Sequence, residues 1–204
     1  MMQQTDDWFA ARCGHVTASR VSDVMAKTKS GYAASRQNYM AELICQRLTG
    51  TVDHGFTNAA MQRGVELEPV AREMYLLNEF DATVTEVGFI KHPSIDFFGA
   101  SPDGLVNHDG LLEIKCPNTW THLETIESGK PKTQYLLQMH VQMMCTGRQW
   151  CDFVSYDDRL PANFSFYKTR IYLDGNLAKE IEHEVRNFLA DMELKIKVIT
   201  EKVK

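Results

Sequence analysis

The sequence predicts an α/β fold in which helices flank a central mixed β-sheet. Short apolar segments of strand length fall between residues 84 and 172, and segments with helical spacing precede, separate and follow them. No repeat, low-complexity tract or linker interrupts this order. The 204 residues are 44% hydrophobic and 24% charged, which suits one domain with a sizeable core. We therefore expect a single domain over 1–204.

The first 80 residues are expected to be mainly helical. A short helix is predicted at 6–12, and Thr17 or Ser19 could cap a second helix that runs to about Met25. Residues 27–34 are expected to form a loop. Apolar spacing predicts a helix at 35–48 that stops at Gly50, and another helix at about 58–78.

Residues of about 81–172 are expected to form the sheet. The predicted strands are 84–90, 97–100, 105–106, 111–116, 150–156 and 164–172. Helices are predicted at 119–127 and 133–146, and a C-terminal helix from about 176 to 204. The turn residues Asn107-His108-Asp109-Gly110 lie between two strands and predict a hairpin that brings Asp103 alongside Glu113.

Two acids and a lysine gather around this hairpin in an otherwise apolar setting. Strand alternation puts Glu113 and Lys115 on one face and Ile114 on the other. Two carboxylates and a backbone carbonyl suffice to anchor Mg²⁺, which prefers oxygen ligands and keeps several waters. One such water can attack a phosphodiester, and Lys115 could hold or deprotonate it. The pattern favours a metal-dependent nuclease.

Each of these residues alone fits a simpler explanation. Asp103 could belong to a Pro-Asp-Gly turn, and Glu113 and Lys115 could form a solvated strand face. Together they favour a site, because the surrounding strand is apolar and buried charges are costly unless they are paired or coordinate a cation.

The residues also match a family pattern. Pro102-Asp103 followed by Glu113-Ile114-Lys115 resembles the PD-(D/E)XK nuclease signature, which implies a restriction-endonuclease-like core. Further segments occur in the order seen in the lambda exonuclease (YqaJ-type viral recombinase) family: Trp8, Arg12-Cys13-Gly14, Thr17-Ala18-Ser19, Gly64 with Glu68, Ser101 to Gly104, Glu113 to Pro117, and Tyr135-Leu136-Leu137-Gln138. The chain thus resembles a phage or prophage alkaline exonuclease from Trp8 to about Asp157.

The resemblance implies a complete active site. Asp103, Glu113 and the Ile114 carbonyl would hold a principal Mg²⁺, and Glu68 would help with a second, with Mn²⁺ as a substitute. Gln138 would orient Lys115 or the attacking water. On the residues alone, Glu66 and Glu68 are indistinguishable, and Gln134, Gln138 and Gln142 simply share one helix face.

The resemblance also implies contacts with DNA. Arg12, Ser19 and Ser101 would form a pocket for a 5′-phosphate, although Ser19 could equally cap a helix and Ser101 could belong to a turn. Lys29 would contact duplex DNA, and Met61 would act as an apolar wedge, whereas a methionine in a helix is more often in the core. His140 replaces a glutamine common in relatives, and we favour a packed or surface histidine over a metal ligand.

The implied function is Mg²⁺-dependent 5′-to-3′ digestion of one strand of linear double-stranded DNA, which leaves a 3′ overhang for a single-strand annealing protein. Family members form ring-shaped homotrimers. Two alternatives stay open: an endonuclease of restriction or repair type in the same superfamily, and a catalytically inactive DNA-binding protein.

Composition and charge agree with a bacterial cytoplasmic protein. No apolar segment reaches the length of a membrane span, the N-terminus is polar, and five cysteines without a Cys-x-x-Cys pair predict reduced thiols. The net charge of −5 is unusual for a DNA-binding protein. Between Arg12 and Arg47, however, six basic residues stand against two acids, which predicts a positive DNA-facing segment.

Overall fold

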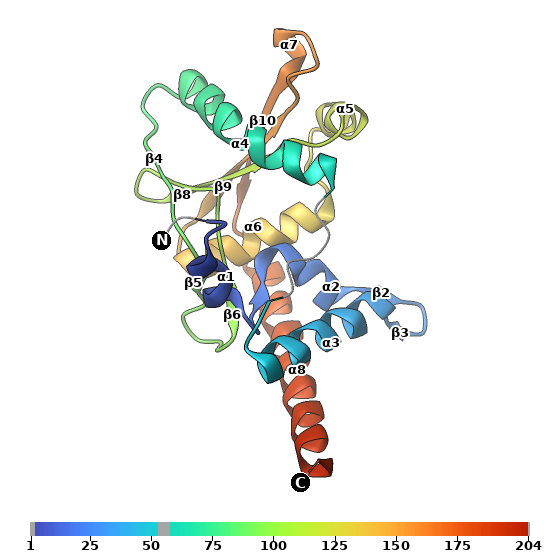
Figure 1. Ribbon diagram of the computed structural model, residues 1–204. Helices are drawn as coiled ribbons and strands as arrows, with labels where there is room; N and C mark the ends of the chain where they lie inside the picture. Colours follow the sequence, from blue (N-terminus) through green and yellow to red (C-terminus); the bar gives the residue numbers. More distant parts are fainter. Residues whose placement is uncertain (1–2, 53–57, 204) are drawn as a thin grey trace.

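A central five-stranded mixed sheet organises the computed structural model, which describes residues 3–52 and 58–203 (Figure 1). Its strands lie in the order β10-β9-β8-β7-β4. Their bounds are β4 Val84–Thr85, β7 Gly104–Val106, β8 Gly110–Lys115, β9 Trp150–Tyr156 and β10 Phe166–Tyr172. Strands β8 and β9 are parallel and the other neighbours are antiparallel, so the predicted mixed sheet flanked by helices is confirmed.

A second, three-stranded sheet has the order β1-β6-β5, with β1 Val16–Thr17, β5 Ile90–Lys91 and β6 Phe98–Ala100. The expectation of one strand at 84–90 was wrong, because β4 pairs with β7 in the central sheet whereas β5 pairs with β6. The interruption includes Gly88, and glycine weakens the interior of a strand.

The helices surround these sheets. Their bounds are α1 Asp6–Arg12, α2 Val21–Met25, α3 Ala34–Thr49, α4 Ala59–Asn78, α5 Thr119–Ser128, α6 Thr133–Thr146, α7 Ala162–Ser165 and α8 Gly175–Lys202. The Thr5 hydroxyl caps α1, and α3 ends at Gly50 in a left-handed conformation (φ 71°), as the sequence predicts. None of the described helices is long and apolar enough to cross a bilayer.

Three local expectations were wrong. The second helix begins as a 3₁₀ turn, Ala18–Arg20, and no side chain caps it, since the Thr17 hydroxyl lies 3.4 Å from that of Ser19 instead. The expected loop at 27–34 contains a hairpin of β2 Lys27–Thr28 and β3 Gly31–Tyr32. Short helix α7 was missed, because its four residues are too few for helical spacing to be recognised.

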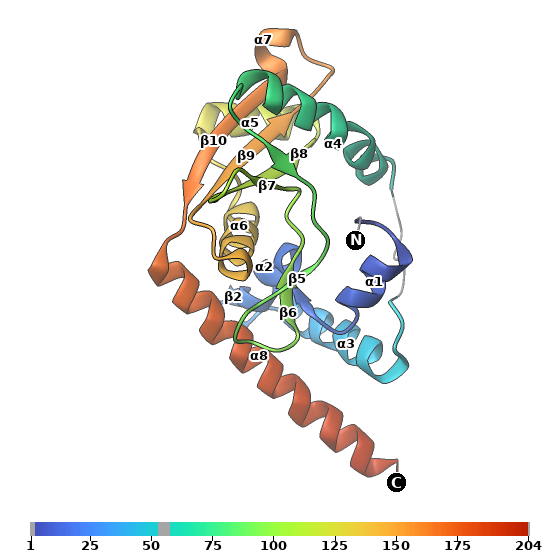
Figure 2. The ribbon, with the colours of Figure 1, turned by 90° about the vertical axis from the view of Figure 1, so that its left-hand side faces the viewer.

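Helices cover both faces of the central sheet. On one face, Leu111 and Phe153 pack with Met139 and Met143 of α6. On the other face, Leu112, Ile114 and Val154 pack with Ala71 and Tyr75 of α4, and Figure 2 shows the sheet between the two helices. Strand alternation therefore puts Glu113 and Lys115 on one face and Ile114 on the other, as predicted, and the face with Glu113 meets α6.

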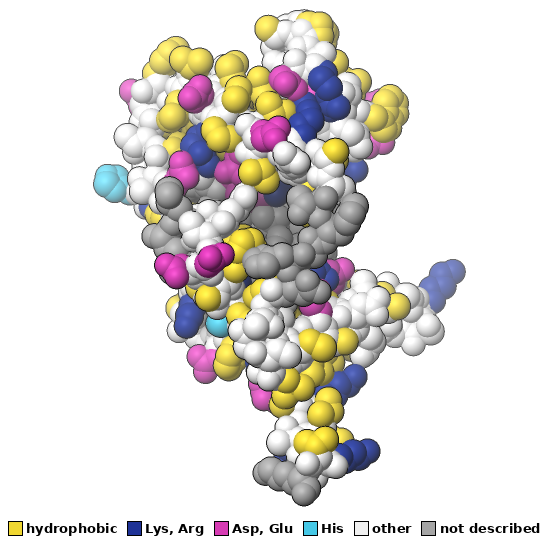
Figure 3. Space-filling model, viewed as in Figure 1, with side chains coloured by type: hydrophobic (Ala, Val, Ile, Leu, Met, Phe, Trp, Pro, Cys, Tyr) yellow, Lys and Arg dark blue, Asp and Glu magenta, His cyan; other side chains and the backbone are white. Residues whose placement is uncertain are grey.

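Helix α8 neutralises much of the positive charge in the N-terminal third. Its acids pair with three of the six basic residues counted there, and Arg20 pairs locally: Lys27–Glu184, Arg36–Asp191, Arg47–Glu193, Arg20–Asp23 and Arg20–Glu42. Among the residues that the structure describes, only Arg12 and Lys29 of the six make no ion pair. In the view of Figure 3, basic side chains are dispersed over the surface rather than gathered in one patch.

Candidate active site

The predicted hairpin between β7 and β8 forms and brings Asp103 to Glu113. Gly104 pairs with Leu112, and Asn107 makes the turn in a left-handed conformation (φ 46°) that asparagine tolerates. The Ile114 backbone N–H donates to Asp103 Oδ2 at 2.7 Å. This bond fixes the Ser-Pro-Asp-Gly segment against the strand that carries Glu113 and Lys115.

Glu113 is fully buried, and three donors surround its carboxylate. Gln138 Nε2 donates to Oε1 at 2.7 Å and Gln142 Nε2 donates to Oε2 at 2.6 Å. Lys115 Nζ also lies 2.5 Å from Oε1. Gln138, which the resemblance expects to orient Lys115 or the attacking water, thus donates to the same carboxylate that Lys115 contacts. Sequence reasoning missed Gln142, whose only signal was its place on the same helix face.

Two neighbouring carboxylates raise the pKa of the Lys115 amine. Burial lowers the pKa of its amine, but the negative charges of Glu113 and Asp103 and the contact with Glu113 raise it by more, so the net pKa is raised. The amine also lies 5.3 Å from the centre of the Tyr135 ring. The contact with Glu113 keeps the amine at the cavity, where it could hold or deprotonate the attacking water.

Helix α4 places Glu68, but not Glu66, at the site. Glu66 is exposed and accepts from Gln62 on the helix surface, whereas Glu68 is partly buried and lies 2.6 Å from Arg72. Arg72 also donates to the Asp103 backbone carbonyl at 3.3 Å, so it links α4 to the β7–β8 hairpin. The structure thus distinguishes Glu68 from Glu66, which the sequence alone could not do.

The three carboxylates suit a divalent cation. Burial raises the pKa of Asp103 well above its usual value, and the negative charges of Glu113 and Glu68 raise it further. Burial likewise raises the pKa of Glu68, and the charge of Glu113 adds to that rise despite Arg72. No three His, Cys, Asp or Glu side chains among residues 3–52 and 58–203 form a preformed metal cluster. Two carboxylates, a carbonyl and waters nevertheless meet the requirement of Mg²⁺, so the donor set fits.

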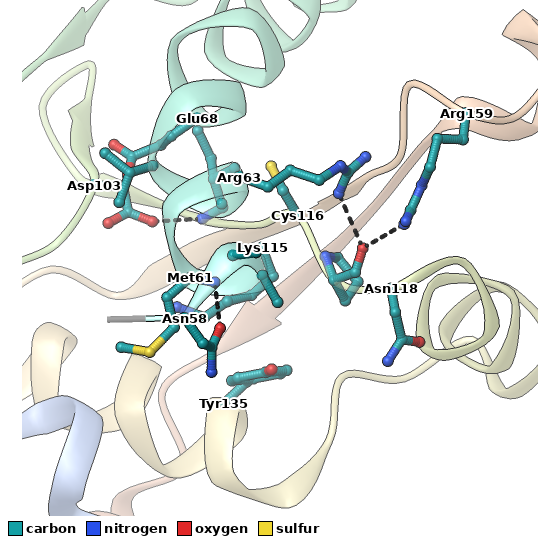
Figure 4. A pocket seen from close by; sticks show the side chains of 16 residues that line it. Asn58, Met61, Arg63, Glu68, Asp103, Lys115, Cys116, Asn118, Tyr135 and Arg159 are labelled. Atoms are coloured by element: carbon teal, nitrogen blue, oxygen red, sulfur yellow. Dashed lines mark hydrogen bonds between the residues drawn. The ribbon is translucent and has the colours of Figure 1, made fainter. Parts of the chain in front are cut away.

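A cavity of about 720 Å³ opens beside these residues (Figure 4). Glu68, Asp103, Ile114 and Lys115 line one part of it. Met61 also lines the cavity and is 57% exposed, so it lies at the surface rather than in the core. Tyr135, which belongs to one of the family segments, lines the cavity too, and sequence reasoning missed three further lining residues, which no local spacing connects to the motif: Arg63, Asn118 and Arg159.

Arg12 and Ser101 come together, as the resemblance implied. Arg12 Nη1 donates to Ser101 Oγ at 3.3 Å, the Trp8 indole N–H donates to the same oxygen at 2.9 Å, and the guanidinium lies 4.0 Å from the Trp8 ring centre. Burial lowers the pKa of Arg12 to about 10. Ser19 is exposed and contacts Thr17, and no contact joins it to Arg12 or Ser101 within the described parts of the chain.

Two other predicted residues lie apart from the cavity. Lys29 is exposed between the two strands of the β2–β3 hairpin. His140 is buried, its Nδ1 lies 2.7 Å from the Leu136 carbonyl, and its Nε2 accepts from the Asp174 backbone N–H at 3.2 Å. His140 is therefore a packed histidine that joins α6 to the start of α8.

Comparisons with known proteins show the family and the fold. The model of the YqaJ-like viral recombinase domain matches residues 7–149. LHK-Exo, an alkaline exonuclease from Laribacter hongkongensis, is 63% identical over 98% of both chains, with a TM-score of 0.91. Its complex with dAMP is also 63% identical over 98% of both chains and gives a TM-score of 0.92.

A more distant structure shares the fold alone. A phage-related exonuclease from Haemophilus somnus 129PT is 16% identical over 92% of this chain and 96% of that chain, with a TM-score of 0.72. No curated protein matches the chain.

Proposed function

The chain belongs to the YqaJ-like viral recombinase family, and we propose that it is a metal-dependent deoxyribonuclease that digests linear double-stranded DNA from its ends. The observation that carries this proposal is that Asp103 and Lys115 line one cavity, while the buried Glu113 lies directly behind them in contact with Lys115. The 63% identity to an alkaline exonuclease that binds dAMP, a 5′-mononucleotide, supports cleavage at a DNA end.

The metal-binding residues that we propose are Asp103, Glu113, the Ile114 carbonyl and Glu68. When bound, Mg²⁺ would neutralise charge on the scissile phosphate and lower the pKa of a coordinated water, and Mn²⁺ would substitute for it. Two ions fit the family pattern, with Glu68 contributing to the second. The mutual repulsion of the buried carboxylates supports cation binding here.

The chain's own side chains would complete the chemistry. Lys115 would hold or deprotonate the attacking water at the cavity that it lines. Gln138 would keep Glu113 in place through the bond to Oε1. Arg72 would do the same for Glu68 through an ion pair of 2.6 Å.

We further propose 5′-to-3′ polarity, with a 3′ overhang as product. The pairing of Arg12 with Ser101 supports a pocket for a 5′-phosphate, because a guanidinium binds phosphate through two parallel hydrogen bonds. Ser19 would add a hydroxyl to this pocket, Lys29 would contact the duplex, and the exposed Met61 would separate the strands.

The assembly that we propose follows the family: a homotrimeric ring around DNA, acting with a single-strand annealing protein. Ring closure would explain processive digestion. We expect a phage- or prophage-encoded protein that acts in the cytoplasm of a bacterial host, with residues 1–204 working as a single nuclease domain.

End-labelled linear duplexes with and without a 5′-phosphate, digested in Mg²⁺, test this function, with a closed circular plasmid as the control. We expect mononucleotide release from the phosphorylated linear duplex and an intact circle. Cutting of the circle at fixed positions would favour a restriction- or repair-type endonuclease. Retention of DNA without any product would indicate an inactive DNA-binding protein.

A further inference from the structure

Gln142 is the one donor to Glu113 that the proposed mechanism leaves unused. Its Nε2 donates to Glu113 Oε2 at 2.6 Å, while Gln138 Nε2 donates to Oε1 at 2.7 Å. The two glutamines lie four residues apart on α6, so they project from one face of the helix. Together they hold both oxygens of a single buried carboxylate.

Packing alone does not explain an amide at this position. Gln142 is fully buried, and its Oε1 has no hydrogen-bond partner within the described residues. A buried acceptor without a donor destabilises a fold, and an apolar side chain of similar volume would avoid that penalty. The neighbouring α6 residues Met139 and Met143 are buried methionines. The Nε2 group of Gln142, which donates to Glu113, therefore explains why an amide occupies this position.

We infer that Gln142 is a positioning residue that fixes the orientation in which Glu113 meets a divalent cation, an inference that rests on the proposed function. A carboxylate offers about four lone-pair positions, and Gln138, Lys115 and Gln142 occupy three of them. The carboxylate cannot rotate without breaking these contacts. Its one remaining lone pair therefore points in a fixed direction. Loss of such an outer partner typically costs 10–100-fold in metal affinity or activity.

The test replaces the amide with apolar side chains of similar size, Gln142→Met and Gln142→Leu. Gln134→Met is the matched control, because Gln134 lies on the same helix face but is exposed. Calorimetric titration with Mn²⁺, without DNA, measures cation affinity, and thermal melting measures folding. Digestion at increasing Mg²⁺ then gives the half-saturating Mg²⁺ concentration and, separately, the KM for DNA.

For Gln142→Met and Gln142→Leu we expect the Mn²⁺ dissociation constant and the half-saturating Mg²⁺ concentration to rise about 10-fold or more. The KM for DNA should stay near the wild-type value, both variants should fold with a lower melting temperature because the buried Glu113 Oε2 loses its donor, and Gln134→Met should change nothing. Gln138→Met should weaken Mn²⁺ binding too, and the double variant should lose less than the product of the two single losses, since both amides act through one carboxylate.

Unchanged Mn²⁺ affinity in a folded Gln142 variant would overturn the inference and leave the proposed function intact. Failure of both variants to fold would make Gln142 a structural residue and would overturn it as well. Wild-type protein that neither binds Mn²⁺ nor digests DNA would instead remove the proposed function itself.

Discussion

Replacing Arg12 with glutamine should abolish most of the preference for a phosphorylated 5′ end. Arg12 makes no ion pair with a described carboxylate, and its side chain is held by Ser101 and the face of Trp8. Although burial lowers its pKa to about 10, the guanidinium stays charged at neutral pH. A partly buried cation without a described carboxylate partner is available for an anionic ligand such as a terminal phosphate.

The size of the effect follows from the bonds that would be lost. A hydrogen bond to a charged group contributes about 1.5–3 kcal/mol, which corresponds to about 10- to 150-fold in rate or binding. Glutamine keeps a neutral donor on a shorter polar side chain, so the charge is removed and the fold should be unaffected. Arg12→Lys should fall in between, since it keeps the charge but loses the planar, two-pronged donor.

Initial digestion rates on two end-labelled duplexes, identical except for the 5′-phosphate, measure this preference as a ratio. Wild-type protein and both variants are compared at subsaturating DNA and one fixed salt concentration. Arg12→Gln should slow digestion of the phosphorylated duplex by about 10- to 150-fold and leave the unphosphorylated duplex nearly unchanged. Equal slowing of both duplexes would refute the phosphate pocket, because Arg12 would then act on the fold or on DNA in general.

Three further predictions concern the metal site and the fold. Asp103→Ala or Lys115→Ala should lower the digestion rate by about 10²-fold or more with an unchanged circular dichroism spectrum, and wild-type rates in either variant would contradict the site. Chelation with EDTA should stop digestion, and added Mg²⁺ or Mn²⁺ should restore it, whereas sustained activity in EDTA would exclude the metal mechanism. Gly99→Ala should lower the melting temperature by several degrees, because its Cβ would lie 2.7 Å from the Ile90 carbonyl oxygen and such overpacking costs about 1–3 kcal/mol. Gly175→Ala, whose Cβ would meet nothing within 4 Å, is the control, and equal melting of the two variants would contradict the reasoning.

The sequence predicted most of what depends on local patterns. Strand β9 and helices α1 and α6 begin and end where apolar spacing places them, and the turn residues before Gly110 predicted the hairpin that joins Asp103 to Glu113. These features are encoded within a few residues of one another, so one sequence suffices to recognise them.

Contacts between distant segments could not be predicted in this way. The bond from Gln142 to Glu113 spans 29 residues, and the pairing of Lys27 with Glu184 spans 157. Nothing in local spacing distinguishes Glu68 from Glu66, since only the packing of α4 against the hairpin turns one of them toward the cavity. The division of 84–90 between two sheets likewise depends on the partners β7 and β6.

The pairing of α8 with the N-terminal third also affects how the protein would respond to salt. Each DNA phosphate that a protein cation neutralises releases condensed counterions, and the logarithm of the affinity falls by about 0.9 per contact for each logarithmic unit of salt. Because α8 already neutralises Lys27, Arg36 and Arg47, few cations in this region can take part in that exchange. The protein would then bind the interior of a duplex weakly. By pairing with these cations, α8 would favour binding at DNA ends over nonspecific binding along the duplex.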